Sequence, residues 1–347
     1  MRGYLLRRVG QAVLVLWAAY TLSFVLLSAL PGDAINNRIS APDSGLTRES
    51  GEILLRYYGL DRPLWEQYLQ GLGRALHGDF GLSLSTAQSV RDLLSDALPS
   101  TLQLTGLALL FGVLLAGTLA VLINYSPWAR VRNVLAGVPS LFASVPTFVV
   151  GILALQYLSF RAHLIPSVDN GTFVALVAPA IALGLVIAAP LAQVFGASIR
   201  ATRTQPFVHV LQAKGAGEGY IFRKDVFRNS SLPVLTLFGL AVGELIAGSV
   251  VTESVFARDG IGNLVVSAVN TQDLPVVQGV VILSTAAYVV VNLAVDLAYP
   301  FIDPRILVDG RTVRMVSRQV PRPAGGGRLV AAGEPGLRPL PVDGAMP

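Results

Sequence analysis

The stretch from Gln212 to Pro233 reads QAKGAGEGYIFRKDVFRNSSLP and lies between two long apolar runs. It holds both lysines of the chain, Lys214 and Lys224, and three glycines within five positions. Because a glycine in a helix interior costs roughly 1 kcal/mol relative to alanine, no continuous membrane helix is expected here. The aromatic and basic residues that follow suit a short amphipathic element outside the bilayer that faces another protein. A solvated, positively charged loop is the alternative.

The bulk composition indicates a protein that crosses a membrane several times. Of its 347 residues, 53% are hydrophobic and only 14% are charged, and the mean hydropathy is +0.60, which is too apolar for an ordinary soluble domain. The net charge of +5 does not predict a nucleic-acid partner, because the arginines lie between apolar runs and near the C-terminus rather than on one basic face. Cysteine is absent and the three histidines are far apart, so disulfides are excluded and no metal site is expected.

Six apolar runs are long enough to cross about 30 Å of hydrocarbon. They cover residues 9–30, 101–123, 134–160, 172–199, 232–255 and 276–301. The first run is longer than the apolar core of a cleaved signal peptide, so it is expected to be a retained membrane helix. A cleaved signal peptide is the alternative. Kinks are expected near the prolines that interrupt these runs, Pro139, Pro146, Pro179 and Pro190.

The chain is expected to divide into four segments. Residues 1–30 form the N-terminus and first membrane helix, 31–99 an insert outside the membrane, 100–308 a core with the other five helices and a loop at about 205–231, and 309–347 a disordered tail rich in proline and glycine. Within the insert, Asp61 and Pro63 can begin a helix. The run Gly78-Asp79-Phe80-Gly81 is a turn signal.

The distribution of basic residues predicts the orientation of the chain. The loop between residues 199 and 231 carries six lysines and arginines, whereas the two short connections on the other side carry one each, Arg161 and Arg258. Since short loops rich in basic residues stay in the cytoplasm, both termini and the Gln212 loop are expected to be cytoplasmic, and the insert is expected to face out.

Signatures of catalysis are absent from the sequence. No metalloprotease motif, serine elbow or cysteine nucleophile occurs. The phosphate-binding loop needs Gly-Lys-Ser/Thr, but the two lysines follow Ala213 and Arg223. Any nucleotide hydrolysis that drives this protein is therefore expected on a partner.

Three ionisable residues lie in or beside the last two apolar runs. Glu244, near the middle of the fifth run, could line a polar pathway or meet a hydrogen-bonding neighbour in the bundle. Asp296 is expected to be an interfacial group near Arg305, and membership of a proton relay is the alternative. Glu253 and Phe256 belong to a connection that could close an outer vestibule or form an inert re-entrant turn.

The Gln212 loop resembles that of the permease subunits of ABC importers, specifically the first, B-type permease of the dipeptide, oligopeptide and nickel family. The resemblance extends over about residues 1–308. The loop match rests on Gln212-Ala213-Lys214-Gly215, Phe222-Arg223-Lys224 and Arg228 to Pro233. Further matching segments include Leu30-Pro31-Gly32-Asp33, Tyr58 to Leu64, Gly78 to Gly81, Ser144 to Phe148, Thr252 to Phe256, Gly260-Ile261-Gly262 and Asp303-Pro304-Arg305.

The resemblance implies six membrane helices, with an extracytoplasmic insert between helices 1 and 2 and a cytoplasmic coupling helix between helices 4 and 5. In this family the coupling helix sits in a groove of the ATPase subunit. Gly215 would be its turn glycine, and two positions depart from the general loop pattern, with His209 in place of glutamate and Arg228 in place of proline. The residues implied in ATPase coupling are Ala213, Lys214, Gly215, Glu218, Tyr220, Ile221, Phe222, Arg223 and Lys224.

The resemblance also implies a function and its partners. The chain would be a non-catalytic pore subunit in a bacterial inner membrane, importing peptides, and Glu244, Glu253 and Phe256 are the candidates for its translocation pathway. Its partners would be a homologous second permease, two ATPases that bind the ATP and Mg, an extracytoplasmic binding protein and membrane lipid. Dipeptides, longer peptides, nickel chelates and haem-like cargo all stay open as substrates. The alternative is a secondary transporter or channel that works without an ATPase.

Overall fold

The computed structural model describes residues 2–29, 62–169 and 171–302. Contacts divide the chain into Met1–Pro304 and Arg305–Pro347, and every described residue belongs to the first unit. The described part is helical and contains no β-sheet, only an isolated bridge between Leu82 and Ser89. The prediction of an all-α membrane protein is confirmed. The tail and the first half of the insert lie outside the described residues.

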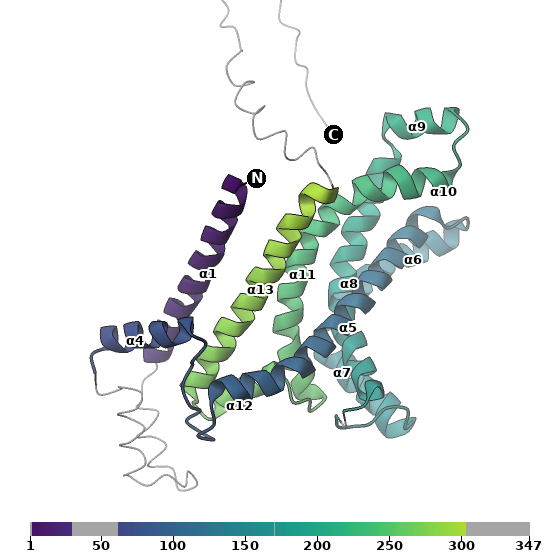
Figure 1. Cartoon of the computed structure of the whole chain (residues 1–347). Coiled ribbons are helices and arrows are strands. Elements are labelled where there is room, and N and C mark those ends of the chain that lie inside the picture. The colour runs from purple at the N-terminus through teal and green to yellow at the C-terminus, as the bar shows by residue number, and fades with distance from the viewer. Residues whose placement is uncertain (1, 30–61, 170, 303–347) are drawn as a thin grey trace, which may run out of the picture. The chain divides into compact units, whose positions relative to one another are not determined.

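Five of the described helices are long and apolar enough to cross a membrane, and a bent pair makes up to six. The five are α1 (Arg2–Ala29), α5 (Val90–Tyr125), α8 (Phe173–Arg203), α11 (Phe227–Val255) and α13 (Leu274–Ile302). The bent pair consists of α6 (Ala129–Ser144) and α7 (Thr147–Ala154), which continues into the π-helical segment η1 (Leu155–Arg161). Figure 1 shows α8 and α11 at the centre of this bundle and α1 at its edge.

The expected third span is broken rather than continuous. Its two halves meet at Val145 and Pro146 with a bend of 95°. Val145 is extended, with ψ 119°, because the ring of a following proline disfavours the α conformation in the residue before it. By contrast, Pro179 and Pro190 lie inside the single helix α8. Of the four prolines, Pro146 therefore ends a helix, while these two are accommodated within one.

Helices α5 and α8 approach each other closely along the core. A Cβ atom added to Gly184 would lie 2.7 Å from the backbone oxygen of Ala108, and one added to Gly112 would lie 2.6 Å from Ile187. Small residues allow this approach, as is usual between membrane helices. The core between α5, α8 and α11 is completed by Leu104, Leu183, Leu191, Ala241 and Leu245.

We call the end of the bundle that carries α4 (Leu64–Leu76) and α12 (Ile261–Asn270) the insert end. Helix α4 starts directly after Pro63 without a side-chain cap, and the proposed cap Asp61 lies outside the described residues. The turn at Gly78 and Gly81 is confirmed, since both have positive φ, 73° and 84°. Helix α5 begins at Val90, eleven residues before the expected start of the second span at residue 101.

Hydrogen bonds tie the insert to the last two helices. The buried carboxylate of Asp273, between α12 and α13, accepts from the Ser83 hydroxyl at 2.5 Å, from the Ser85 hydroxyl at 2.7 Å and from the backbone N–H groups of Leu84 and Ser85. Helix α4 is joined to α1, because Tyr20 donates to the Tyr68 carbonyl at 3.2 Å. The second half of the insert is thus a packed part of the bundle.

Candidate functional site

The opposite end of the bundle, which we call the loop end, carries the Gln212 stretch (Figure 1). After α8 the chain forms α9 (Pro206–Ala213), turns, and continues through α10 (Glu218–Ile221) and the π-helical segment η2 (Phe222–Val226) into α11. The expected interruption of the helix lies at this turn. Gly215 has φ +83°, a left-handed conformation that glycine adopts without the strain caused by a Cβ atom. The Ala216 N–H closes the turn on the Leu211 carbonyl at 3.1 Å.

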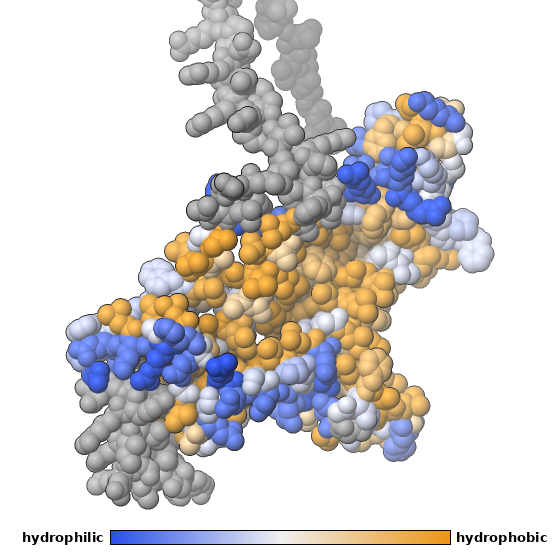
Figure 2. Space-filling model, in the orientation of Figure 1, coloured by the Kyte–Doolittle hydropathy of each residue, from blue (hydrophilic) through white to orange (hydrophobic). Residues whose placement is uncertain are grey.

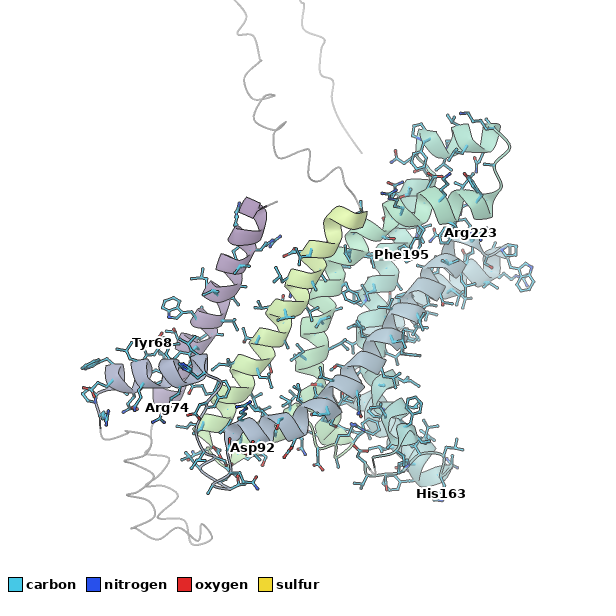
Figure 3. The ribbon with its side chains drawn as sticks, in the orientation of Figure 1. Tyr68, Arg74, Asp92, His163, Phe195 and Arg223 are labelled. Atoms are coloured by element: carbon cyan, nitrogen blue, oxygen red, sulfur yellow. The ribbon has the colours of Figure 1, made fainter. Side chains whose placement is uncertain are left out.

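An apolar cluster fixes the underside of the loop to the membrane helices. Val208, Ile221 and Val226 are buried against Ala120 of α5 and against α8. Aromatic rings extend the cluster, with Phe222 5.1 Å from Tyr125 and Phe195 5.9 Å from Phe227 between ring centroids. Figure 3 shows Phe195 of α8 next to the loop element that carries Arg223. Burial of this cluster holds the loop against three membrane helices.

Arg203, at the end of α8, adds a polar connection between the loop and α5. Its guanidinium lies 4.3 Å from the centroid of the Tyr125 ring and donates to the backbone carbonyl of Asn124. It also faces the Glu218 carboxylate of α10 at 3.7 Å. One side chain therefore contacts α5 and α10 from α8. We call Arg203, Tyr125 and Glu218 the Arg203 clamp.

The implied coupling residues fall into two groups. Ile221 and Phe222 point into the apolar cluster and hold the loop in place. The other seven are exposed: Ala213, Lys214, Gly215, Glu218, Tyr220, Arg223 and Lys224. Among them, Lys224 donates to the Tyr220 hydroxyl at 2.8 Å, and the Tyr220 side chain is 49% exposed.

The exposed face of the loop also includes residues that the sequence analysis did not single out. Phe207 and Val210 of α9 are large apolar side chains, and Val210 is 53% exposed. Pro206 at the first position of α9 is a signal for the start of a helix. Because apolar residues lie on more than one face of that short helix, the sequence could have indicated that some of them are exposed. We call Phe207, Val210, Tyr220, Arg223 and Lys224 the loop-end face.

The pathway candidates differ in their surroundings. The Glu253 carboxylate is fully buried and accepts from the Thr101 hydroxyl at 2.7 Å and from the Gly262 N–H at 2.8 Å. Phe256 is also buried, and Gly151 makes room for its ring. Glu244, in contrast, is exposed on α11. A pathway role for Glu253 and Phe256 stays a prediction, and their contacts are those of groups that hold the insert end together.

Two ion pairs link segments distant in sequence. Arg258 binds Asp169 at 2.9 Å and donates to the Ser100 hydroxyl at 3.1 Å, joining the α11–α12 connection to the η1–α8 connection and to α5 at the insert end. Asp296 was expected near Arg305, which lies outside the described residues, and in the structure it pairs with Arg8 of α1 at 3.0 Å. In the described part of the chain, no three His, Asp or Glu side chains gather in a group that could hold a metal ion.

Comparison with protein families places the structure in context. Residues 102–308 match the family described as the binding-protein-dependent transport system inner membrane component. The matched region runs from α5 through the last helix and includes the whole Gln212 loop.

Individual proteins match over nearly their full length. The chain is 32% identical to the dipeptide transport system permease protein DppB of Lactococcus lactis subsp. cremoris, over 87% of this chain and 98% of that protein. It is 30% identical to the glutathione transport system permease protein GsiC of Escherichia coli K12, over 88% and 99%. It is 31% identical to the probable peptide ABC transporter permease protein y4tP of Sinorhizobium fredii, over 87% and 98%.

The solved structures agree on the fold. A chain of the MetNI methionine ABC transporter in an inward-facing conformation superimposes with a TM-score of 0.52 at 16% identity. The superposition covers 60% of this chain and 96% of that one. At this level of identity the match shows a shared arrangement of helices.

Proposed function

Because this chain belongs to the family of binding-protein-dependent transport system inner membrane components, we propose that it forms one half of the membrane pathway of an ATP-driven peptide importer. Its relatives are named for dipeptide, glutathione and peptide transport. These names share a peptide substrate, and the proposal takes that class as the cargo. A secondary transporter or channel would have no use for a partner-binding loop.

The loop-end face is the observation that carries the proposal. It presents exposed apolar side chains, Phe207, Val210 and Tyr220, beside the cations Arg223 and Lys224 on an element that packs on three membrane helices. Aromatic anchors flanked by charges are typical of protein interfaces. We take this face as the surface that docks on an ATPase subunit, with ATP and Mg bound by that partner.

The apolar cluster and the Arg203 clamp give the loop a mechanical role. Phe222 of the loop contacts Tyr125 of α5, and Arg203 of α8 contacts the same ring, so a displacement of the loop-end face would also displace α5 and α8. Since packed interiors transmit displacement rather than absorb it, movement of the ATPases would move these helices. This coupling requires no chemistry in the chain itself.

The remaining partners follow from the orientation of the chain. We place the loop end in the cytoplasm, where six basic residues between 199 and 231 favour it. The insert end then faces out, in the position to receive peptide from an extracytoplasmic binding protein. A homologous second permease completes the pathway.

Replacing Gly215 tests the coupling role. The substitution Gly215→Val forces a β-branched residue into φ +83° and reshapes the turn without a steric contact elsewhere. In proteoliposomes containing the complete transporter, we expect ATP hydrolysis to persist while ATP-driven peptide uptake falls about tenfold, because a strain of ~1–2 kcal/mol displaces the loop-end face.

The matched control is Gly78→Val. Gly78 has a similar φ, +73°, and also has open space around it, but it lies at the insert end. Uptake per ATP hydrolysed should stay near that of the parent. Normal uptake by the Gly215→Val complex would contradict the coupling role, and failure of the chain to co-purify with any ATP-hydrolysing subunit would contradict the proposed function.

A further inference from the structure

Helix α11 presents one exposed stripe along its whole length. Its members recur every three or four residues, which places them on a single helical face. They are Pro233, Thr236, Leu240, Glu244, Ala247, Val251 and Ser254. The other sides of α11 are covered, since Gly248 lies against Leu183 of α8 and Gly243 lies against Tyr288 of α13.

The stripe is not suited to lipid. Glu244 lies about 16 Å along the helix from its end at Val255, deep in the segment assigned as a membrane span. Within the described part of the chain, its carboxylate takes part in no hydrogen bond or ion pair. A carboxylate at that depth is costly in hydrocarbon, so such residues face water or another polar group. The stripe therefore faces water or a polar group outside this chain rather than hydrocarbon.

The unpaired carboxylate of Glu244 limits the kind of group that it can bind. Glu253 on the same helix is satisfied by a hydroxyl and by backbone N–H groups, whereas Glu244 is left with its full capacity to accept hydrogen bonds. The stripe contains no cation that could neutralise it. The complement of an unpaired carboxylate is a group that carries both positive charge and N–H donors.

We propose that Glu244 is a subsite in the membrane pathway that recognises an ammonium group of the passing substrate. This inference rests on the proposed function, because it assumes that the exposed stripe lines a peptide pathway. Every peptide with a free N-terminus carries an ammonium group, so the subsite would favour unmodified peptides over N-blocked ones. Thr236 and Ser254 are exposed on the same stripe on either side of it, and their hydroxyls donate to the backbone carbonyls of Leu232 and Val250.

The test compares two peptides in the complete transporter. Trialanine and N-acetyl-trialanine are supplied at concentrations that saturate the binding protein, and ATP-driven uptake into proteoliposomes is measured for the parent and for Glu244→Gln. Because the same binding protein serves both, its own selectivity cancels when the variant is compared with the parent. We expect Glu244→Gln to lower trialanine uptake about tenfold, the effect of losing one charge-assisted hydrogen bond, and to leave uptake of the acetylated peptide unchanged.

Two further variants sharpen the result. Glu244→Asp keeps the charge and should retain most of the preference for the free amine. Leu240→Gln places the same amide one turn away on the same stripe while Glu244 remains, and it should keep the preference of the parent. If Glu244 instead pairs with the second permease, Glu244→Gln should lower the uptake of both peptides equally. That result would overturn the proposal, and so would unchanged uptake of both peptides.

A separate measurement distinguishes the two levels of inference. If the parent transporter takes up neither these peptides nor dipeptides or longer peptides, the peptide-import function is wrong. Equilibrium binding of labelled trialanine to the purified complex then decides the subsite on its own. Weaker binding by Glu244→Gln supports the subsite, and equal binding by parent and variant refutes it.

Discussion

Two buried carboxylates, those of Asp273 and Glu253, hold the segments of the insert end together. Asp273 receives four hydrogen bonds from Ser83, Leu84 and Ser85. Glu253 accepts hydrogen bonds from the Thr101 hydroxyl of α5 and from the Gly262 N–H at the start of α12. Buried acceptors of this kind stabilise a structure mainly because their donors would otherwise be left unsatisfied. Each carboxylate joins segments that are far apart in the sequence.

Removing the Asp273 carboxylate should release the insert. Asp273→Ala leaves two hydroxyls and two backbone N–H groups without their acceptor, and we expect a loss of about 2–4 kcal/mol of stability. Thermal unfolding of the purified protein in detergent should occur at a lower temperature, and limited proteolysis should cut earlier near residues 77–89. Asp259→Ala is the matched control, since Asp259 is an exposed carboxylate nearby in the chain. Identical melting of parent and Asp273→Ala would contradict this role.

At the scale of elements, the loop packs against the ends of α5 and α8. The short helices α9 and α10 are too small to be stable alone, so the apolar cluster and the Arg203 clamp hold them. The π-helical segment η2 lets the chain pass into α11 while Val226 stays buried. The loop-end face is thereby connected to the membrane helices.

Loosening the clamp should weaken the link without removing the docking surface. Arg203→Gln loses the contact with the Tyr125 ring and the ion pair with Glu218, which together are worth about 1–2 kcal/mol. We expect the complex to assemble normally and the number of peptides imported per ATP hydrolysed to fall severalfold. Arg200→Gln, an exposed arginine about one turn earlier on α8, should behave like the parent. An unchanged transport ratio for Arg203→Gln would show that the clamp does not transmit movement.

At the scale of the molecule, much apolar surface stays uncovered within this chain. Figure 2 shows a broad hydrophobic band between hydrophilic groups over α4 and over the α9–α10 loop. In the apolar part of α8, 67% of the residues are buried, against 22% for α11 and 11% for α1. Under the proposed function, lipid and a second permease would cover the rest.

The absence of cysteine allows a direct test of orientation. Lys214→Cys places a single thiol at the loop end, and His77→Cys places one at the insert end, both at exposed positions. In spheroplasts, a membrane-impermeant maleimide should label position 77 at once and position 214 only after the membrane is permeabilised. Labelling of position 214 in intact spheroplasts would reverse the proposed topology.

The sequence predicts those features that leave a local pattern. Apolar length locates the helices, the proline at 146 indicates a kink, and the glycine at 215 indicates a turn. The 95° bend itself and the start of α5 at Val90 depend on tertiary packing. The burial of Glu253 could not be read from its neighbours, because its donors Thr101 and Gly262 are supplied by other elements. Hydrogen bonds between residues far apart in the sequence leave no repeating pattern from which they could be predicted.

The bonds between Ser83 and Asp273 span 190 residues, and this separation sets an order of events during synthesis. At about 5–20 residues per second, Asp273 is made roughly 10–40 s after Ser83. Throughout that interval Ser83 and Ser85 lack the carboxylate that accepts their hydrogen bonds. A nascent chain that stops before Asp273 therefore lacks the acceptor for Ser83 and Ser85, and proteases on that side of the membrane would distinguish it from a finished subunit. The second half of the insert can therefore close on this carboxylate only after 273 of the 347 residues have been made.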